Sequence, residues 1–456
     1  MKEQIINEFK GKKVLILGFG REGRSTYNFI KENEIDCIIG IADKKEILDE
    51  EIKANKEINL HTGEGYLDAM NEYDIIMKTP GISFKDVDIT NVKHKITSQT
   101  NLFIKYGKEK VIGITGTKGK STTSSLIYNI LKKEYNSVLV GNIGLPAFEM
   151  IDGFSDTNWY IYELSSHQLQ YVEHSPKIAV LLNMYEEHLD HYKSYDEYKE
   201  AKRNIFKFQD DNDTYVFNLD MKDILNEENV LNQNLIEVTN NEEVTGAQVK
   251  YNETHISMNV QGKVCEITLP HDELPLKGIH NMYNIAVASV VAKLLDVSNE
   301  DIIEGIMTFK TLPHRLENIG TYNGITYIDD SIATIPQATI SAVNSVDNVD
   351  TVIIGGMDRG INYKPLISFL ATGAVKNVIL MYDSGRQIYE KLKSNTLANV
   401  IFAEDLEKAV ELATQITDKG MTCVMSPSAA SYGVFKNFEE RGDKFKEYVI
   451  RFSSNV

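Results

Sequence analysis

The sequence predicts an α/β protein of three domains with mostly parallel sheets. Its 456 residues are too many for one hydrophobic core and suit about three domains. Strand-like apolar runs alternate with helical patterns along almost the whole chain, which is typical of parallel strands joined by helices. Two of the strand-to-helix turns are rich in glycine, as turns that hold phosphate are.

The first domain, assigned to residues 1–106, opens with a dinucleotide-binding pattern. A strand leads into Gly18-x-Gly20-x-x-Gly23 and a helix, and the next strand ends at Asp43, about 20 residues further on. This pattern predicts a Rossmann-like domain. Taken alone it would suggest a dehydrogenase, but any pyrophosphate bound at a helix N-terminus needs the same glycines.

The second domain, assigned to residues 107–307, begins with a phosphate-binding loop of unusual spacing. The stretch GITGTKGKSTT has an isoleucine at position 114, where a standard P-loop has its first glycine. An apolar strand precedes Gly116 and a helical pattern follows Gly119, so backbone N–H groups and the helix dipole favour an anion there. Lys120 would reach the outer phosphates of ATP and the Ser121 hydroxyl a Mg²⁺ ion. The alternative is a plain turn with an exposed lysine.

The third domain, assigned to residues 308–456, follows a loop-rich segment, FKTLPHRLE. Four predicted strands (TYIDDS, NVDTVIIGG, KNVILMY and MTCVMSPS) and the helical pattern LEKAVELATQI give it a Rossmann-like character. A pyrophosphate-type domain followed by an ATP domain is unusual in a redox enzyme. It suits an enzyme that uses ATP to join a nucleotide-tagged substrate to a second molecule.

Composition narrows the class of partner. Hydrophobic residues make up 42% and charged residues 25% of the chain, which is ordinary for a soluble globular enzyme. A net charge of −18 argues against binding nucleic acid or an anionic membrane through overall charge. Three scattered cysteines, no signal-like start and no long apolar run lead us to expect a cytoplasmic protein.

The short motifs, taken in order, resemble those of the Mur ligases, most closely the members that add glutamate. Each motif alone is weak, but the ordered set is highly specific. Members of that family have a shorter Gly-x-x-Gly-Lys-Ser/Thr loop, which accounts for the missing glycine at position 114. The motifs are GFGREG, KTPGIS, TGTKGKSTT, GNIGLP, YELSSHQL, EEHLDHY, YKEAK, LKGIHNMYN, LPHRLE, IDDSIAT, GGMDRG and SPSAASYGVFKNFEERG.

The resemblance implies an amide ligase of the cytoplasmic stage of peptidoglycan precursor synthesis. ATP would phosphorylate the carboxylate of UDP-N-acetylmuramoyl-L-alanine, and the amine of D-glutamate would attack the acyl phosphate. Because negative charges converge when a carboxylate attacks a triphosphate, Mg²⁺ and lysine must neutralise them. The implied partners are these small molecules, without nucleic acid or membrane, and we expect a monomer.

The resemblance also assigns site residues by their motif positions. The catalytic residues are Lys120, Glu163, His188, Lys202 and Arg315. The ATP site comprises Gly116, Thr117, Lys118, Gly119, Lys120, Ser121, Thr122, Asn281, Arg315 and Asp330. The UDP-substrate site comprises Gly18, Phe19, Gly20, Arg21, Asp43, Thr79, Pro80, Gly81 and Asn142. The glutamate site comprises Thr334, Arg359, Ser431 and Phe438. Two Mg²⁺ ions would be held by Ser121, Glu163, His188 and Lys202.

Lys202 is the most unusual of these residues. In the family the matching lysine is carbamylated, which turns a cation into an oxygen ligand of the kind Mg²⁺ prefers. The pattern YKEAK by itself would equally fit an exposed amphipathic helix. A lone His188 is more often structural, and Arg315 could form a solvated salt bridge.

Three departures from the family pattern leave the stereochemistry of glutamate open. Ile332 stands where D-glutamate ligases usually have lysine, Arg359 lies in the turn GGMDRG where they usually have lysine, and Asn101-Leu102-Phe103 replaces an ELF-type segment. We therefore expect Arg359 to be the principal cation for a carboxylate of glutamate. The alternatives are the same reaction with L-glutamate, a folylpolyglutamate-synthase-like ligase, a dehydrogenase, and a non-catalytic nucleotide-binding protein.

Overall fold

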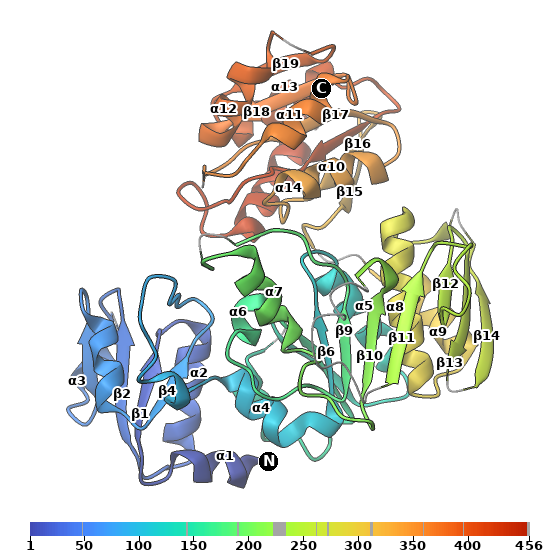
Figure 1. Ribbon diagram of the computed structural model, residues 1–456. Helices are drawn as coiled ribbons and strands as arrows, with labels where there is room; N and C mark the ends of the chain where they lie inside the picture. Colours follow the sequence, from blue (N-terminus) through green and yellow to red (C-terminus); the bar gives the residue numbers. More distant parts are fainter. Residues whose placement is uncertain are drawn as a thin grey trace. The chain divides into compact units, whose positions relative to one another are not determined.

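The chain folds into two compact units, shown in the computed structural model of Figure 1. The first unit comprises Met1–Leu274 and Ile279–Phe309, and the second comprises Pro275–Gly278 and Lys310–Val456. The first unit holds two sheets and the second holds one, so the predicted α/β class with mostly parallel sheets is confirmed. The structure describes residues 1–47, 49–142, 145–188, 191–221, 234–260, 262–270, 273–310, 313–358, 360–394 and 396–453.

The N-terminal sheet has five parallel strands in the order β3-β2-β1-β4-β5. Because the strand order reverses between β1 and β4, their carboxyl ends form the crevice where such sheets bind ligands. The strands are β1 (Lys13–Leu17), β2 (Ile38–Asp43), β3 (Asn59–Thr62), β4 (Ile75–Lys78) and β5 (Ile96–Thr97), and the helices are α1 (Lys2–Phe9), α2 (Arg21–Glu32) and α3 (Glu50–Ala54).

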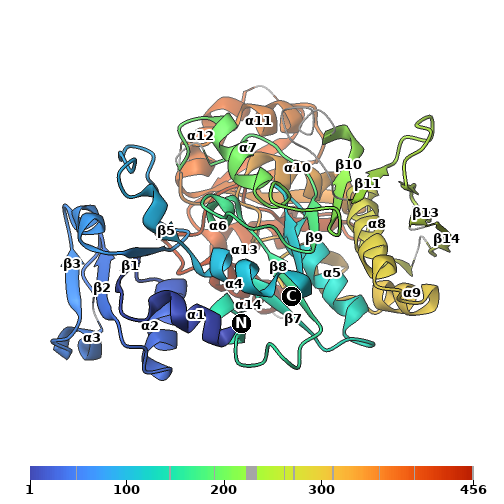
Figure 2. The same ribbon diagram turned by 60° about the horizontal axis from the view of Figure 1, so that its bottom comes forward.

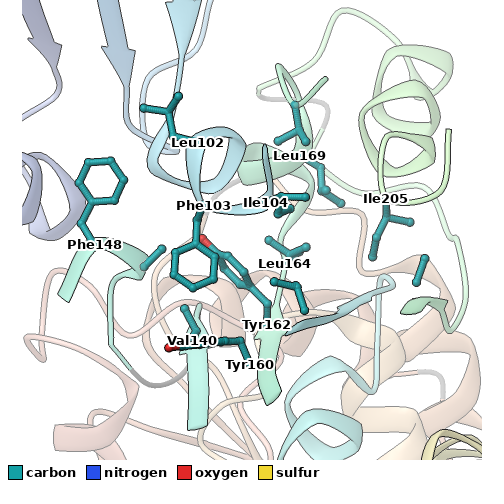
Figure 3. Close-up of a cluster of buried hydrophobic side chains, with 14 of the residues drawn as sticks. Leu102, Phe103, Ile104, Val140, Phe148, Tyr160, Tyr162, Leu164, Leu169 and Ile205 are labelled. Atoms are coloured by element: carbon teal, nitrogen blue, oxygen red, sulfur yellow. The ribbon is translucent and has the colours of Figure 1, made fainter. Parts of the chain in front are cut away.

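Helix α4 (Gln99–Gly107) joins the N-terminal sheet to the central one. Its Phe103 meets Tyr160 edge-on, with ring centroids 5.0 Å apart, in the apolar cluster of Figure 3. The same core includes Phe9 and Phe29 from the N-terminal part, which explains why both sheets belong to one unit. The predicted boundaries at 106/107 and 307/308 stay predictions; the first falls inside α4.

The central sheet has nine strands in the order β14-β13-β12-β11-β10-β9-β6-β8-β7. Strands β6 to β12 run parallel. Strand β13 runs antiparallel to both β12 and β14, and β13 and β14 lie at one end of the sheet in Figure 2. The sequence patterns did not reveal this antiparallel end. The strands are β6 (Val111–Thr115), β7 (Ser137–Gly141), β8 (Trp159–Glu163), β9 (Ile178–Leu181), β10 (Thr214–Asn218), β11 (Asn234–Thr239), β12 (Val249–Tyr251), β13 (His255–Val260) and β14 (Lys263–Thr268).

The helices around this sheet carry the motifs. Helix α5 packs against α8 and α9, and α8 is buried along most of its length, as its continuous apolar run requires. Short α6 begins with a capping box in which the Ser165 and Gln168 side chains bond each other's backbone N–H. The helices are α5 (Lys120–Leu131), α6 (Ser166–Leu169), α7 (Tyr195–Arg203), α8 (Ile279–Leu294) and α9 (Asn299–Met307).

The second unit is built on a six-stranded sheet in the order β15-β16-β20-β17-β18-β19. Only the edge strand β15 is antiparallel. The strands are β15 (Glu317–Tyr322), β16 (Ile325–Asp329), β17 (Val349–Ile354), β18 (Asn377–Met381), β19 (Asn399–Ala403) and β20 (Thr422–Met425), and the helices are α10 (Pro336–Ser345), α11 (Lys364–Ala371), α12 (Tyr382–Leu392), α13 (Leu406–Ile416) and α14 (Phe438–Ser453). No helix among the described residues is long and apolar enough to cross a membrane.

Candidate active site

All nine residues predicted for the UDP-substrate site line one cavity of about 750 Å³ in the first unit. Most of them follow the carboxyl ends of β1, β2 and β4, at the point where the strand order reverses. Asn142, which follows β7, comes from the central part. The cavity therefore spans both sheets of the first unit, as a long nucleotide-linked substrate requires.

The glycine turn after β1 is shaped by close packing. Gly18 has a φ of +91°, and a Cβ there would lie 2.1 Å from Thr79 Oγ1. The Asp43 carboxylate accepts the backbone N–H groups of Phe19 and Lys45, each at 2.8 Å. Asp43 thus ties together the loops after β1 and β2, a structural role beside the ligand contact predicted for it.

Glu163 lies next to the part of the cavity wall that comes from the central sheet. The side-chain amide of Asn142, which lines the cavity, donates a hydrogen bond of 2.9 Å to Glu163 Oε1. Glu163 is the last residue of β8 and pairs with Ile114 of β6, just before the phosphate loop. The N-cap of the following helix is Ser165, so Glu163 does not cap a helix.

Glu163 is fully buried, and its Oε2 has no hydrogen-bond partner among the described residues. A buried carboxylate oxygen without a donor is destabilising unless a cation neutralises it. Oxygen donors of this kind are what Mg²⁺ prefers. The residue therefore fits a metal ligand.

The phosphate loop has the geometry expected for an anion site. Gly119 is the N-cap of helix α5; its φ is +83°, and a Cβ there would lie 2.7 Å from Asn284 Oδ1. The Lys120 ammonium donates to the carbonyls of Gly116 and Thr117 at 2.8 and 3.1 Å, so the cation lies over the loop. Ser121 and Thr122, in the first turn of α5, are buried.

The loop is held from β9 and α7 by contacts that the sequence did not reveal. Asn183 accepts the backbone N–H of Lys118 at 2.8 Å and donates to its carbonyl at 3.0 Å. The Thr117 hydroxyl lies 2.8 Å from the Tyr198 hydroxyl. These bonds fix the residues in the middle of the loop, where the backbone must approach phosphate.

Lys202 lies on the buried face of α7 against the phosphate loop. Its ammonium is bonded to the Gly116 carbonyl at 2.9 Å and the Thr115 hydroxyl at 3.2 Å, with 2% of the residue exposed. The alternative of an exposed position is therefore wrong. Burial, reinforced by the charge of Lys120, lowers the pKa of Lys202 well below its ordinary value.

His188 lies in a cluster of rings beside α6 and α7. Its backbone is left-handed, with a φ of +60°, and its ring centroid lies 4.7 Å from that of His167. His167 also contacts His191, with centroids 4.1 Å apart, and mainly because of burial its pKa falls to about 2. His167 was missed although it stands in the quoted motif YELSSHQL, because nothing in that motif separates a ring in a site from one in a core.

Glu187 is a second missed residue. It precedes His188 in the motif EEHLDHY, and its carboxylate lies 3.3 Å from the Lys118 ammonium and 3.7 Å from His188 Nε2. Burial raises its pKa, but the charges of Lys118 and its neighbours outweigh burial and lower the pKa below the ordinary value. Glu187 is therefore an anion that can orient the cations of the phosphate loop.

Asn281 lies in the first turn of α8 and is buried. Its side chain accepts a hydrogen bond of 3.2 Å from Asn284, which in turn accepts one from the Thr123 hydroxyl of α5. The structure thus brings Asn281 next to the helix that begins at the phosphate loop, as a contact to the nucleotide of ATP requires.

The second unit gathers its predicted residues at the carboxyl ends of β16, β20 and β17. Asp330 follows β16 and accepts a hydrogen bond of 2.7 Å from Ser426, which follows β20. Burial raises the pKa of Asp330 to about 7. The backbone N–H of Leu316 donates to Asp330 at 3.3 Å, which brings the neighbouring Arg315 close.

The residues predicted to bind glutamate lie on these same loops. Ser431 is buried after β20, Thr334 is half-buried after β16, and Phe438 begins α14. The Phe438 carbonyl accepts the Ser331 hydroxyl at 2.8 Å. Arg359 lies outside the described residues.

Arg441 was missed as a member of this region. It is fully buried in α14 and donates to the Ser331 hydroxyl at 3.0 Å, the Ser331 carbonyl at 2.7 Å and the Ala429 carbonyl at 3.1 Å. It therefore ties the loop after β16 to the loop after β20. The motif that ends in FEERG contains it, but a charged residue in a helix is usually exposed, so the pattern gave no signal.

Three family descriptions match the chain in order. They are "Mur ligase MurD-like, N-terminal domain" at residues 12–98, "Mur ligase middle domain" at residues 114–292, and "Mur ligase, glutamate ligase domain" at residues 314–429. Together they cover each of the three sheets.

Named relatives match over nearly the full length. The chain is 34% identical to UDP-N-acetylmuramoylalanine--D-glutamate ligase of Clostridium acetobutylicum, covering 97% of this chain and 98% of the relative. It is 36% identical to the protein of the same name from Clostridium botulinum strain Langeland, covering 97% of each.

Solved structures agree in fold. The ADP complex of MurF ligase from Thermotoga maritima has a TM-score of 0.60 at 15% identity and covers 99% of this chain and 97% of its own. The MurC structure from the same organism has a TM-score of 0.56 at 18% identity and covers 98% and 100%. These matches do not favour a dehydrogenase, a folylpolyglutamate-synthase-like ligase or a non-catalytic protein. The chain belongs to the Mur ligase family.

Proposed function

We propose that this protein is an ATP-dependent ligase that adds D-glutamate to UDP-N-acetylmuramoyl-L-alanine through an acyl phosphate. The observation that carries the proposal is the link through Asn142, which lines the nucleotide cavity and holds Glu163 beside the phosphate loop. A substrate bound by its UDP end would present its far end at the site where ATP phosphate is held. That is the arrangement that phosphorylation of a terminal carboxylate needs.

The residues of the phosphate loop have the roles that this reaction requires. Lys120 and Lys118 neutralise phosphate charge, and the backbone around Gly119 binds phosphate oxygens. Asn281 would contact the base of ATP, while Asp330 and Arg315 in the second unit would contact its ribose and γ-phosphate. These residues come from both units, so ATP binding would depend on groups from each.

Mg²⁺ fits the oxygen donors present. Glu163, whose buried Oε2 has no partner among the described residues, together with Ser121 would hold one ion, and His188 and Lys202 a second. The ions would neutralise the charges that converge during phosphoryl transfer. Lys202 would take part as a carbamate, since burial favours its neutral amine, the form that reacts with carbon dioxide.

The second unit would bind the incoming amino acid with Thr334, Ser431, Phe438 and Arg359. The names of the relatives support D-glutamate, rather than L-glutamate, as the incoming amino acid. The same reaction with L-glutamate rests only on Ile332 and Arg359 in place of lysines. We infer that the chain acts as a monomer in the cytoplasm, where ATP and UDP-linked precursors are available.

Phosphate release in a coupled assay tests the proposal. We expect release only when ATP, Mg²⁺, UDP-N-acetylmuramoyl-L-alanine and D-glutamate are all present, and turnover with L-glutamate lower by about a hundredfold or more. Equal turnover with both isomers, or faster turnover with L-glutamate, would support the alternative. Phosphate release that does not depend on the UDP substrate would contradict the ligase assignment.

A further inference from the structure

A pair of opposite charges, the half-buried Glu22 and the buried Lys78, lies at the wall of the UDP-substrate cavity. Glu22, in the first turn of α2, lines this cavity and also a second, water-sized cavity of about 10 Å³. Lys78, the last residue of β4, lines only the small cavity. Lys78 therefore faces Glu22 without facing the substrate space.

The surroundings of Lys78 offer its charge little other support. The residue is 4% exposed, and in the part of the chain that the structure describes its ammonium has one hydrogen-bond acceptor, the Thr79 carbonyl at 3.3 Å. The rings of Phe84 and Tyr171 lie 5.8 and 5.5 Å away. Burial lowers the pKa of Lys78 to about 8, and the charge of Glu22 opposes that decrease.

Glu22 is held in the cavity wall by the central part of the unit. Gln168 donates a hydrogen bond of 2.9 Å to Glu22 Oε1, while its own carbonyl oxygen accepts the backbone N–H of Ser165. Ser165 and Gln168 line the same cavity as Glu22. The carboxyl group cannot turn away without breaking this chain of bonds.

This arrangement is unfavourable for the substrate unless Glu22 is neutralised. A UDP-linked substrate brings two negative charges on its diphosphate and a third on its carboxylate. At a distance of about 10 Å in protein, one uncompensated carboxylate would weaken binding of such an anion by about tenfold or more. Burial raises the pKa of Glu22, which reduces its charge in part.

We propose that Lys78 is a positioning residue of the substrate cavity: it neutralises Glu22 from behind the cavity wall, so that a diphosphate-linked substrate can bind beside a carboxylate. The inference rests on the proposed function, because it takes the large cavity as the site of the UDP substrate. It adds a residue that acts on affinity for this substrate without touching it.

The test compares Lys78→Met with the double variant Lys78→Met/Glu22→Gln. Affinity for UDP-N-acetylmuramoyl-L-alanine is measured by calorimetry without ATP, from about pH 6 to about pH 8.5. The diphosphate diester and the carboxylate of this ligand keep their charges over that range. Because all other groups are the same in both variants, the ratio of their dissociation constants reports the charge of Glu22 alone.

The other titratable groups around the pair are common to both variants. They are Arg21 beside Glu22, His167 on α6, Tyr171 after α6, and Tyr162, whose pKa responds to Glu22. Burial raises the pKa of Tyr171 to about 12, so this group does not ionise in the range tested.

We expect the single variant to bind about tenfold more weakly than the double variant at the highest pH. The ratio should fall toward one as pH is lowered, because protonation removes the charge of Glu22. A ratio near one at every pH would overturn the proposal, and so would a Lys78→Met variant that binds as tightly as the wild type. Equal weakening of both variants would instead mean that Lys78 acts directly or structurally.

A second comparison does not depend on the stability of Lys78→Met. In the wild type, affinity should weaken as pH rises through about 8, because Lys78 loses its proton and leaves Glu22 charged. Glu22→Gln should lack this decrease, and parallel profiles would overturn the proposal. Lys95→Met is the matched control, because Lys95 is bonded to the Tyr73 carbonyl of the same domain and lines neither cavity. A wild type that fails to bind the ligand would refute the site assignment itself.

Discussion

Lys202 and Glu163 owe their chemistry to burial. Both charged residues are almost inaccessible to water, and each lies where backbone or side-chain partners hold it at the phosphate loop. In water a lysine is a cation and a glutamate is fully solvated. Here burial favours the neutral amine of Lys202 and leaves one oxygen of Glu163 for a cation.

Replacing Lys202 by alanine should reduce ligation by about a hundredfold or more, because the proposed carbamate ligand of the second Mg²⁺ ion, which neutralises charge at the phosphates, is lost. High bicarbonate should not restore activity, whereas small added carboxylates should restore part of it. Phosphate release at limiting Mg²⁺ measures the effect. Lys199→Ala on the same helix is the control, since Lys199 pairs with the exposed Asp196. Wild-type turnover of Lys202→Ala would show that the proposed metal role is wrong.

Replacing Arg359 by alanine should raise the KM for glutamate by about 10- to 100-fold, since hydrogen bonds to charged groups are worth about 1.5 to 3 kcal/mol. The KM for ATP should stay nearly unchanged. Arg359→Lys should recover only part of the loss, because lysine lacks the planar fork that binds a carboxylate in two bonds.

Steady-state kinetics for all three substrates, with a melting curve, check this prediction. Arg386→Ala serves as a control, because Arg386 is exposed and lies over the Phe402 ring in the same unit. An unaltered glutamate KM with a lower melting temperature would mean that Arg359 only braces its turn.

The loop between the first unit and β16 depends on a buried His–Asp pair. His314 Nδ1 lies 2.8 Å from Oδ2 of Asp329, the last residue of β16. The His314 backbone is left-handed, with a φ of +61°. Gly442 of α14 packs against both side chains, and a Cβ there would lie 2.1 Å from His314 Nδ1. The segment that carries Arg315 is thus held in part by a titratable contact.

The stability of the second unit should therefore fall as pH rises. The hydrogen bond to Asp329 raises the pKa of His314. Protonated His314 therefore contributes its full stabilisation below the ordinary histidine pKa of about 6.5, and this contribution is lost as pH rises past the raised pKa. Below the ordinary histidine pKa, the free energy of unfolding of His314→Gln should be about 1 to 3 kcal/mol lower than that of the wild type. The stability of this variant should also depend less on pH.

Melting curves of the full chain between about pH 6 and about pH 9 check this expectation. His255→Gln is the control, because His255 forms an exposed pair with Glu266 in the first unit. If wild type and His314→Gln lose stability in parallel as pH rises, His314 is not the responsible group.

At the scale of the whole molecule, the reaction is divided between two units. Residues proposed for the UDP substrate, the phosphate loop and the metal lie in the first unit, and those proposed for glutamate lie in the second. An acyl phosphate reacts with water, so the units must exclude water while it exists.

We therefore expect small-angle scattering to show a smaller radius of gyration when an ATP analogue and UDP-N-acetylmuramoyl-L-alanine are both bound. The hinge should lie near the segment FKTLPHR, where the first unit ends at Phe309. An unchanged radius of gyration with both ligands bound would contradict closure. UDP-N-acetylmuramoyl-L-alanine alone is the control, since the cavity proposed for it lies in the first unit.

The sequence by itself determined the fold class, the phosphate loop and the order of the motifs. These features are local: an apolar strand, a glycine turn and a helical pattern follow one another within a few residues, so spacing alone reveals them. The nine residues assigned to the UDP substrate came from the family resemblance, and each stands in or beside a glycine-rich motif or at a strand end; the structure places all of them along one cavity.

Only the tertiary structure decided which side chains lose contact with water. Lys202 on an amphipathic helix, Lys78 at a strand end and Arg441 in α14 look like ordinary solvated charges in the sequence. Their burial comes from elements far apart in the chain, because β6, α2 and the loop after β16 supply the surfaces that cover or bond them. The charge state of each side chain, its loss of contact with water and its bonding partner all depend on that packing, which no local sequence pattern encodes.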